Sequence, residues 1–175
     1  MGGKVSIEKI KVSAYTVPTN SPESDGTLEW DSTTMVLVEA AGGDEHGLGY
    51  TYGDVSVGTF IESKLADVVE GADAMSPPAA WAAMQSAIRN AGRPGVGAMA
   101  VSAVDIALWD LKARILGVSL ADALPRFHEA APVYGSGGFT SYPLERLQEQ
   151  LGGWVEAGIP RVKMKVGREP GRDLE

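Results

Sequence analysis

A strand–helix–strand pattern near the C-terminal end constrains the fold more than any other part of this chain. Residues 132–136 resemble a short strand, residues 143–157 an amphipathic helix ended by Gly158, and residues 161–166 a second strand. A strand, a helix and a strand within about 35 residues form a βαβ unit, whose two strands run parallel. A single parallel pair leaves both edges open and its outer faces uncovered, so it is rarely a complete fold.

The N-terminal residues predict a different arrangement. Residues 7–12, 34–39 and 48–52 have the alternation or the composition of strands, and we interpret them as an antiparallel meander. Pro18 is expected to end the first strand, because proline cannot donate to a ladder. Residues 19–32 are polar and rich in turn-forming residues, so we expect them to form a loop.

Three helices are expected to follow the strands. Residues 60–69 have helical spacing, Pro77 opens a second helical segment, and residues 98–116 are apolar over most of the circumference, as in a central buried helix. The sequence therefore predicts an α+β domain over residues 1–125, followed in residues 126–175 by the opening of a larger parallel α/β domain. The alternative is a small α+β protein with a two-stranded C-terminal addition.

Composition and charge exclude several classes of function. The 175-residue chain carries a net charge of −8, which repels phosphate backbones, so we do not expect nucleic-acid binding. It has no cysteine, which excludes disulfides, thiolate zinc sites and cysteine nucleophiles. No apolar run reaches the ~18 residues that a membrane span needs, and the N-terminus has no apolar signal core. We therefore expect a cytoplasmic protein without membrane contact.

The histidines and the helical aspartates do not predict a metal centre. His46 and His128 are the two histidines of the chain, one in an expected hairpin turn and one in a connecting segment, so both are expected at the surface. Asp105 and Asp110 lie five residues apart on the long helix and therefore do not share a face. Salt bridges or caps explain these two carboxylates better than metal ligation does.

Two lysines in the last strand are the main candidates for catalysis. Lys163 and Lys165 point to one face of a strand, whereas Val162, Met164 and Val166 point to the other. If the apolar face packs on helices, the lysines face the interior of a parallel barrel, where burying an ammonium group is costly and suggests an active-site floor. Two neighbouring ammonium groups repel each other, which makes one of them a usable base. The alternative is an exposed edge strand whose lysines discourage aggregation.

Weaker candidates lie in turns and loops. The GSGG segment at residues 135–138 lacks the G-x-G-x-x-G spacing, so it does not predict a dinucleotide site. Ser136 ends a strand and could donate a hydrogen bond to a ligand, or could simply be a turn residue. Trp30 and Tyr52 lie in or beside loops, where they could contact a ligand or partner, or pack against the protein.

The long helix and the two lysines together resemble a known family. The sequence AVSAVDIALWDLKAR at residues 100–114, with GVSL at residues 117–120, resembles the N-terminal signature of the mandelate racemase/muconate lactonising branch of the enolase superfamily. That signature closes with Leu-Leu-Gly, where this chain has Ala-Leu-Pro at residues 123–125. The KMK sequence at residues 163–165 falls where the family carries its K-x-K motif, on the second strand of a modified TIM barrel.

The resemblance implies a fold and an activity. The fold is an α+β capping domain, with a three-stranded antiparallel meander plus helices, followed by the first βαβ unit of a modified TIM (β/α) barrel. Family members abstract the α-proton of a small carboxylate substrate, such as an acid sugar, with Mg²⁺ as cofactor. Racemases, epimerases, acid-sugar dehydratases and cycloisomerases share this step, and the full-length proteins are expected to be homo-oligomers.

The resemblance also implies roles for individual residues. Lys165 is the expected general acid/base, and Lys163 the cation that assists it. Trp30, Tyr52 and Ser136 are the expected substrate-binding residues, the two aromatic ones on capping-domain loops. The metal ligands of the family lie on later barrel strands, so we expect a truncated chain that is inactive alone. The alternative is a non-catalytic binding or oligomerisation module that retains the capping domain.

Overall fold

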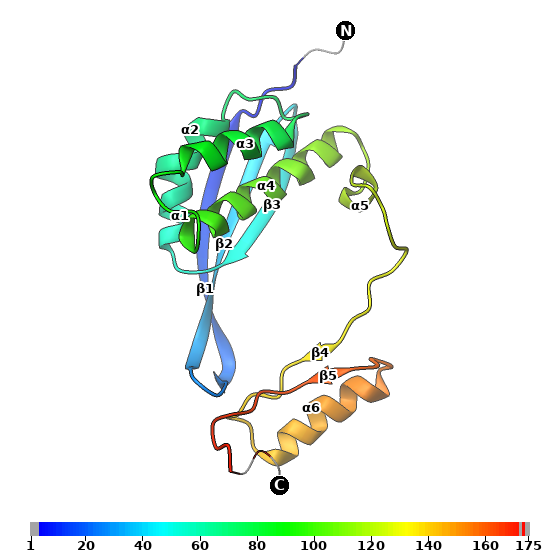
Figure 1. Cartoon of the computed structure of the whole chain (residues 1–175). Coiled ribbons are helices and arrows are strands. Elements are labelled where there is room, and N and C mark those ends of the chain that lie inside the picture. Colours follow the sequence, from blue (N-terminus) through cyan, green and yellow to red (C-terminus); the bar gives the residue numbers. More distant parts are fainter. Residues whose placement is uncertain (1–3, 172, 174–175) are drawn as a thin grey trace. The chain divides into compact units, whose positions relative to one another are not determined.

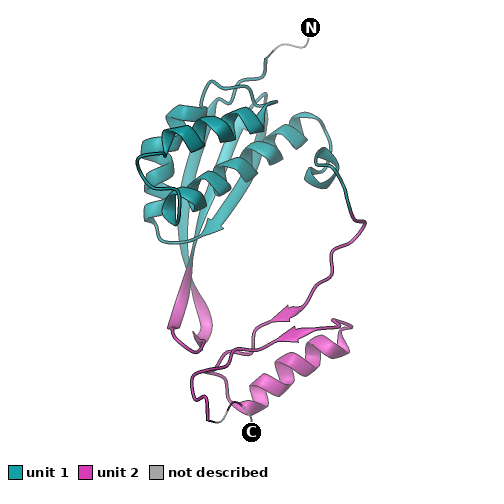
Figure 2. Cartoon of the chain, in the orientation of Figure 1, with its two compact units in different colours: residues 1–17, 34–127 teal, residues 18–33, 128–175 magenta. Residues whose placement is uncertain are grey.

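The computed structural model describes residues 4–171 and residue 173, and the chain divides into two compact units (Figure 2). The first unit consists of the chain up to residue 17 together with residues 34–127. The second unit consists of residues 18–33 and the chain from residue 128 onward. The domain boundary between residues 125 and 126 stays a prediction.

The first unit is built on a three-stranded sheet in the order β1-β2-β3 (Figure 1). The strands of the sheet are β1 (Lys9–Ser24), β2 (Glu29–Gly42) and β3 (Glu45–Tyr52), and residues 18–24 of β1 and 29–33 of β2 belong to the second unit. Each strand pairs with the next one along the chain, and the pairing of β2 with β3 is antiparallel. The predicted antiparallel meander is therefore confirmed.

A two-residue turn joins β2 to β3. Gly43 and Asp44 both have positive φ, at 61° and 62°, which is the backbone of the type I′ turn that matches the twist of a hairpin. The pairing begins directly beside the turn, so that Ala41 lies opposite His46. The expectation that His46 lies in the turn itself was therefore wrong, although its side chain is exposed as expected.

Two further sequence predictions about this region were wrong. Strand β1 does not end at Pro18 but continues to Ser24, and residues 19–32 are not a loop but mostly strand, because β2 already begins at Glu29. Since β1 is an edge strand, a proline in it need not interrupt the ladder when the position of its missing N–H faces the open side. Residues 19–32 are polar because their strands are largely exposed to solvent, not because strands are missing there.

The predicted helices are confirmed, and they cover one face of the sheet (Figure 1). They are α1 (Ser56–Phe60), the π-helical segment η1 (Ile61–Leu65), α2 (Ala66–Val69), α3 (Pro77–Ala87) and α4 (Val96–Ile115). The short helix α5 (Leu120–Ala123), which was not predicted, follows α4. Between sheet and helices lies a fully buried apolar core, which includes Val36, Val38, Ile61, Leu65, Met84, Leu108 and Leu111.

Helix α4 approaches β3 at two glycines. A Cβ atom at Gly47 would overlap the Ala107 carbonyl oxygen and the backbone of Leu111, and one at Gly49 would overlap the Ala103 carbonyl oxygen. The helix contributes small alanines at the same contact, both fully buried. Because the obstacle is backbone on the helix side, no rotamer change could make room for a larger residue in the strand.

Asp110 supports this contact with polar bonds. Its Oδ2 accepts the backbone N–H of Leu48 at 2.8 Å and the Nε–H of Arg114 at 2.9 Å, and the carboxylate raises the pKa of the Arg114 guanidinium. Asp110 is thus engaged in a salt bridge and a backbone contact, as expected from its place on the helix. Partial burial alone raises the pKa of the other helical carboxyl, Asp105.

The second unit contains a small βαβ arrangement. Its elements are β4 (Gly135–Ser136), α6 (Leu144–Glu156) and β5 (Val162–Lys163). The two strands are parallel, with Ser136 opposite Lys163, which confirms the predicted parallel pair although β5 is shorter than the predicted strand. One more backbone bond, from Lys165 N–H to Gly138 O at 2.8 Å, continues the pairing beyond the strands. Within the described part of the chain, no helix is long and apolar enough to span a membrane.

The contact between α4 and β3 yields a stability prediction. Gly49→Ala should lower the free energy of unfolding by about 3 kcal/mol, the upper end of what overpacking costs, because the added methyl meets helix backbone. Leu48→Ala, on the neighbouring exposed position of β3, is the matched control and should change it by less than roughly 1 kcal/mol. Urea unfolding followed by circular dichroism measures both, and equal midpoints for the two variants would contradict this packing.

Candidate active site

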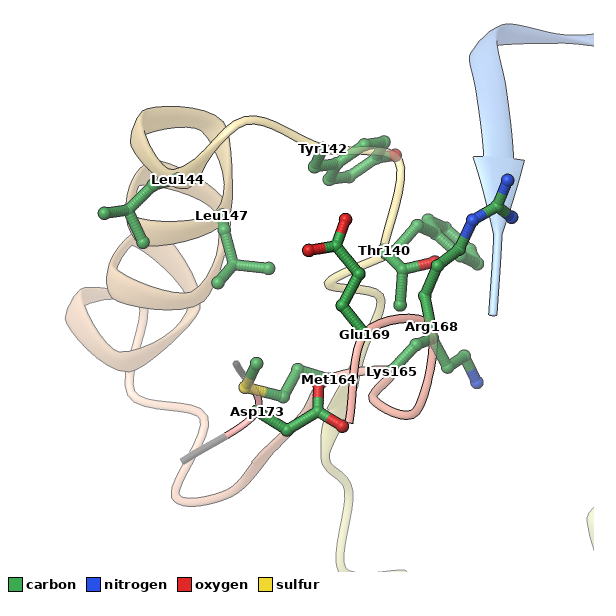
Figure 3. Close-up of a pocket in the computed structure, with 10 residues that line it drawn as sticks. Thr140, Tyr142, Leu144, Leu147, Met164, Lys165, Arg168, Glu169 and Asp173 are labelled. Carbon is green, nitrogen blue, oxygen red and sulfur yellow. The ribbon is translucent and has the colours of Figure 1, made fainter. Parts of the chain in front are cut away.

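The two lysines lie on the face of the parallel pair that is turned away from α6. A Cβ atom at Gly135 or Gly137 would overlap the indole of Trp154, so α6 covers the face to which residues 135 and 137 point. Lys163 is paired with Ser136, the residue between these two glycines, and therefore faces the other way. Figure 3 shows Met164 directed toward α6 and Lys165 directed away from it.

Lys163 and Ser136 are neighbours on this face. They are paired residues of the two strands, and both side chains are exposed. The Nζ of Lys163 lies 6.0 Å from the ring centroid of Tyr134, at the edge of cation–π range. A cation and a hydroxyl thus stand side by side, which is a pair that can bind a carboxylate.

Lys165 is among the residues that line a hollow just beyond the carboxyl ends of the two strands, and in Figure 3 its amine end points away from Leu144 and Leu147 on the other side of the hollow. The hollow has a volume of about 490 Å³. Parallel α/β folds place ligands at this end of their strands. Its lining combines an apolar side with charged groups of both signs: Phe139, Leu144, Leu147, Met164, Lys165, Arg168, Glu169 and Asp173.

The tip of the β1–β2 hairpin, residues 21–30, belongs to the same unit as Lys165. Asp25 closes its turn: Oδ1 accepts N–H bonds from Leu28 at 2.8 Å and Thr27 at 2.7 Å, and the Thr27 hydroxyl at 2.9 Å. The bond from Leu28, then those from Thr27, and to a smaller extent the positive charge of Lys165 hold the pKa of Asp25 below its usual value. The turn therefore carries a fixed negative charge near Lys165.

Thr140 joins this hairpin tip to the segment that follows β4. Its N–H donates to Ser24 O at 2.9 Å, and its hydroxyl donates to Asp25 O at 3.0 Å and lies 2.7 Å from the Ser24 hydroxyl. Ser24 is fully buried and is the one buried polar residue of the described chain. Further along, Ser141 Oγ donates to Pro22 O at 2.7 Å. These contacts were not predicted from the sequence, since their partners lie more than a hundred residues apart.

Trp30 lies in β2, close to the hollow. Its ring meets that of Phe139 edge to face at 5.6 Å, and Phe139 meets Tyr142 in the same way at 5.4 Å. The indole N–H donates to Glu23 Oε2 at 3.0 Å, so the ring orientation is fixed. Trp30 is half-buried and stands one aromatic ring away from the lining that includes Lys165.

Tyr52 ends β3 in the first unit. Its side chain is 62% exposed and meets Tyr50 edge to face at 6.0 Å. The sequence-predicted role of Tyr52 in substrate binding stays a prediction.

The described residues do not provide a metal site. No group of three or more His, Asp or Glu side chains in residues 4–171 and 173 is arranged to hold a metal ion. The Mg²⁺ implied by the resemblance would therefore need ligands other than these.

Comparison with known proteins places the chain within a family. The sequence profile of the mandelate racemase/muconate lactonizing enzyme N-terminal domain matches residues 9–124. Among curated relatives, 3,6-anhydro-alpha-L-galactonate cycloisomerase of Streptomyces coelicolor is 32% identical over 170 residues, covering 93% of this chain and 46% of the relative. L-talarate/galactarate dehydratase of Salmonella typhimurium is 30% identical over 173 residues, covering 93% and 44%.

Solved structures agree with this relationship. A mandelate racemase/muconate lactonizing enzyme-like protein from Rubrobacter xylanophilus superposes with a TM-score of 0.95 and 80% identity, over 96% of this chain and 47% of that one. The Salmonella typhimurium dehydratase, liganded with Mg and L-lyxarohydroxamate, has a TM-score of 0.84 and 27% identity, over 98% and 47%. The chain thus spans about half the length of the relatives it matches.

The hydrogen bonds at the hairpin tip predict the titration of Asp25. Its carboxyl should titrate below the ordinary value of 3.8. A depressed pKa means that Asp25 contributes its stabilisation above the ordinary value and loses it as the pH falls through the lowered one. Carboxyl NMR across pH 2 to 6 (roughly the range of ionising carboxyls) measures this, and Asp25→Asn keeps the acceptor oxygen while removing this titration. A midpoint at or above 3.8 would contradict the turn geometry.

Proposed function

Because the chain belongs to the mandelate racemase/muconate lactonizing enzyme family, we propose that it is the N-terminal part of an enzyme that abstracts the α-proton of a carboxylate substrate. It contributes the capping domain and the first parallel strands of the barrel. The observation that carries the proposal is the placement of both lysines on the face opposite α6, with Lys165 lining the hollow at the strand ends.

We assign the proton transfer to Lys165. An amine at the carboxyl end of a barrel strand can take a proton from a substrate bound above the strands and return it to the same or another position. Lys163, two residues before Lys165, contributes a positive charge. This charge attracts the substrate carboxylate and favours the anion that forms as the proton leaves. Ser136, paired with Lys163, supplies a hydrogen-bond donor on the same face.

The proposed substrates are acid sugars. Relatives carry names that refer to galactarate, talarate and anhydrogalactonate, and their reactions include dehydration and cycloisomerisation. Trp30 and Tyr52 are the proposed substrate-binding residues of the capping domain. Racemase, epimerase or dehydratase chemistry would all begin with the same proton abstraction, and a homo-oligomer of the full-length protein stays a prediction.

Magnesium is the proposed cofactor of the whole enzyme. Structures of relatives contain it, as in the racemase from Streptomyces coelicolor with bound magnesium, which is 31% identical over 93% of this chain. The described residues of this chain offer no group that could hold it. A divalent cation supplies much of the electrostatic stabilisation in such chemistry, so we propose that the 175-residue chain alone is inactive.

A fusion protein tests the proposal. Residues 1–175 joined to the second half of the 80% identical Rubrobacter xylanophilus protein should exchange the α-proton of an acid sugar for deuterium in D₂O with Mg²⁺. Lys165→Ala should lower the exchange rate by roughly 10²–10⁴-fold, the usual contribution of a general base. Proton NMR measures exchange over a panel of acid sugars.

Two controls make the outcome decisive. Lys64→Ala removes an exposed lysine in η1 and should leave the exchange rate unchanged. Undiminished exchange in Lys165→Ala would refute its role as the proton carrier. Exchange by the 175-residue chain alone, lost in Lys165→Ala, would refute the proposed inactivity of that chain.

A further inference from the structure

The hairpin tip contacts two backbone segments next to Lys165: the segment that pairs with it and the segment that follows it. On one side, Thr140 is bonded to Ser24 and Asp25 by its N–H and its hydroxyl, at 2.7–3.0 Å. Thr140 follows Gly138 by two residues, and the Gly138 carbonyl accepts the Lys165 N–H at 2.8 Å. The backbone that pairs with Lys165 is thereby fixed to the hairpin.

On the other side, Gly26 lies directly against the backbone that follows Lys165. A Cβ atom at Gly26 would stand 2.7 Å from Val166 O and 3.2 Å from Gly167 C, so a side chain at this position would push the two segments apart. The neighbouring ion pair between Arg168 Nη2 and Glu29 Oε2, at 2.9 Å, links the same two segments.

Within these 175 residues, the parallel pair around Lys165 is short. β4 and β5 have two residues each, and the apolar side chains of Val162, Met164 and Val166 are 38–55% exposed. Isolated two-stranded pairs are at best marginally stable in water. The bonds and close contacts of the hairpin tip therefore provide much of the constraint on the backbone at Lys165.

We propose that the Ser24–Gly26 segment is a clamp that positions Lys165, with Ser24, Gly26 and Thr140 as its positioning residues. The clamp consists of two contacts. The hydroxyls of Ser24 and Thr140 form a hydrogen bond in which Ser24 is buried, and Gly26 lies against the backbone that follows Lys165. Its importance for proton transfer rests on the proposed function, whereas the clamp itself concerns only the geometry of this chain.

Asp25 is the middle residue of the clamp, and the pKa of its carboxyl depends on the contacts around it. Its carboxylate is held by the bonds of its own turn, and the positive charge of Lys165 helps to lower its pKa. The titration of Asp25 therefore responds mainly to the bonds of its own turn and, to a smaller extent, to the charge of Lys165.

Hydrogen exchange at the Lys165 amide is the first test. Gly26→Ala should lower the protection of this amide at least tenfold, because the added methyl displaces the Val166–Gly167 backbone. Gly152→Ala adds the same methyl in α6, where it meets no atom within 4 Å apart from its chain neighbours and the adjacent backbone of the helix, and should leave the protection unchanged. Equal protection in the two variants, or an unprotected Lys165 amide in the unchanged chain, would overturn the clamp.

The hydroxyl pair is tested by a conservative rescue. Thr140→Val keeps the shape of the side chain but removes its hydroxyl, which leaves the buried Ser24 hydroxyl without this partner and should lower Lys165 amide protection. Thr140→Ser retains the hydroxyl and should restore protection to within a few-fold of the unchanged chain. Indistinguishable protection in the two variants would overturn the role of Thr140.

The carboxyl titration of Asp25 gives the spectroscopic test. Lys165→Met removes the charge that helps to lower the pKa of Asp25, so the carboxyl should titrate at higher pH than in the unchanged chain. Lys163→Met is the matched control and should move this midpoint less than Lys165→Met does. A midpoint that responds equally to both, or to neither, would overturn the placement of Lys165 beside the clamp.

The clamp and the proposed function can fail separately. If amide protection and the Asp25 titration respond as expected while the fusion protein shows no α-proton exchange, the clamp stands and the proposed function fails. If the fusion protein exchanges α-protons with the same rate in Gly26→Ala and Gly152→Ala, the clamp does not position Lys165 for catalysis.

Discussion

The packing of the first unit depends on backbone-to-backbone contact between helix α4 and strand β3. Gly47 and Gly49 let the helix lie directly on the strand, and the small side chains of Ala103 and Ala107 match them from the helix side. With the helix at that distance, Val36, Val38 and Ala40 of β2 are fully buried, and Asp110 reaches the backbone N–H of Leu48. A larger residue at either glycine would separate the two elements and open the core along its whole length.

A second use of glycine links the fold to the candidate chemistry. Gly26 at the hairpin tip lies against the backbone just after Lys165, with no side-chain atoms between the two segments. Strand β3 lies against α4 in the same way. The buried hydroxyls of Ser24 and Thr140 add directional bonds to this contact. The Lys165 side chain is thus carried by a backbone that contacts the hairpin tip on both sides, and proton transfer requires such fixed positioning.

Local patterns in the sequence predicted much of this structure. The helical period located the helices, strand alternation identified the face of Lys163 and Lys165, and the spacing of elements predicted the parallel pair. The errors arose where tertiary context decides: Pro18 continues an edge strand, and the polar hairpin tip folds as strand because it has a partner. Contacts such as Ser24 with Thr140 join residues 116 positions apart and leave no local signal.

The interleaved order of the second unit has a consequence for biosynthesis. Ser24 leaves the ribosome 116 residues before its partner Thr140, and Glu29 precedes Arg168 by 139 residues. At typical elongation rates, on the order of 5–20 residues per second, the hairpin tip waits for roughly 6–28 s with its backbone unpaired on one side. Polar side chains and proline at a strand edge disfavour pairing with a wrong neighbour, and this segment has both during the interval before its partner is synthesised.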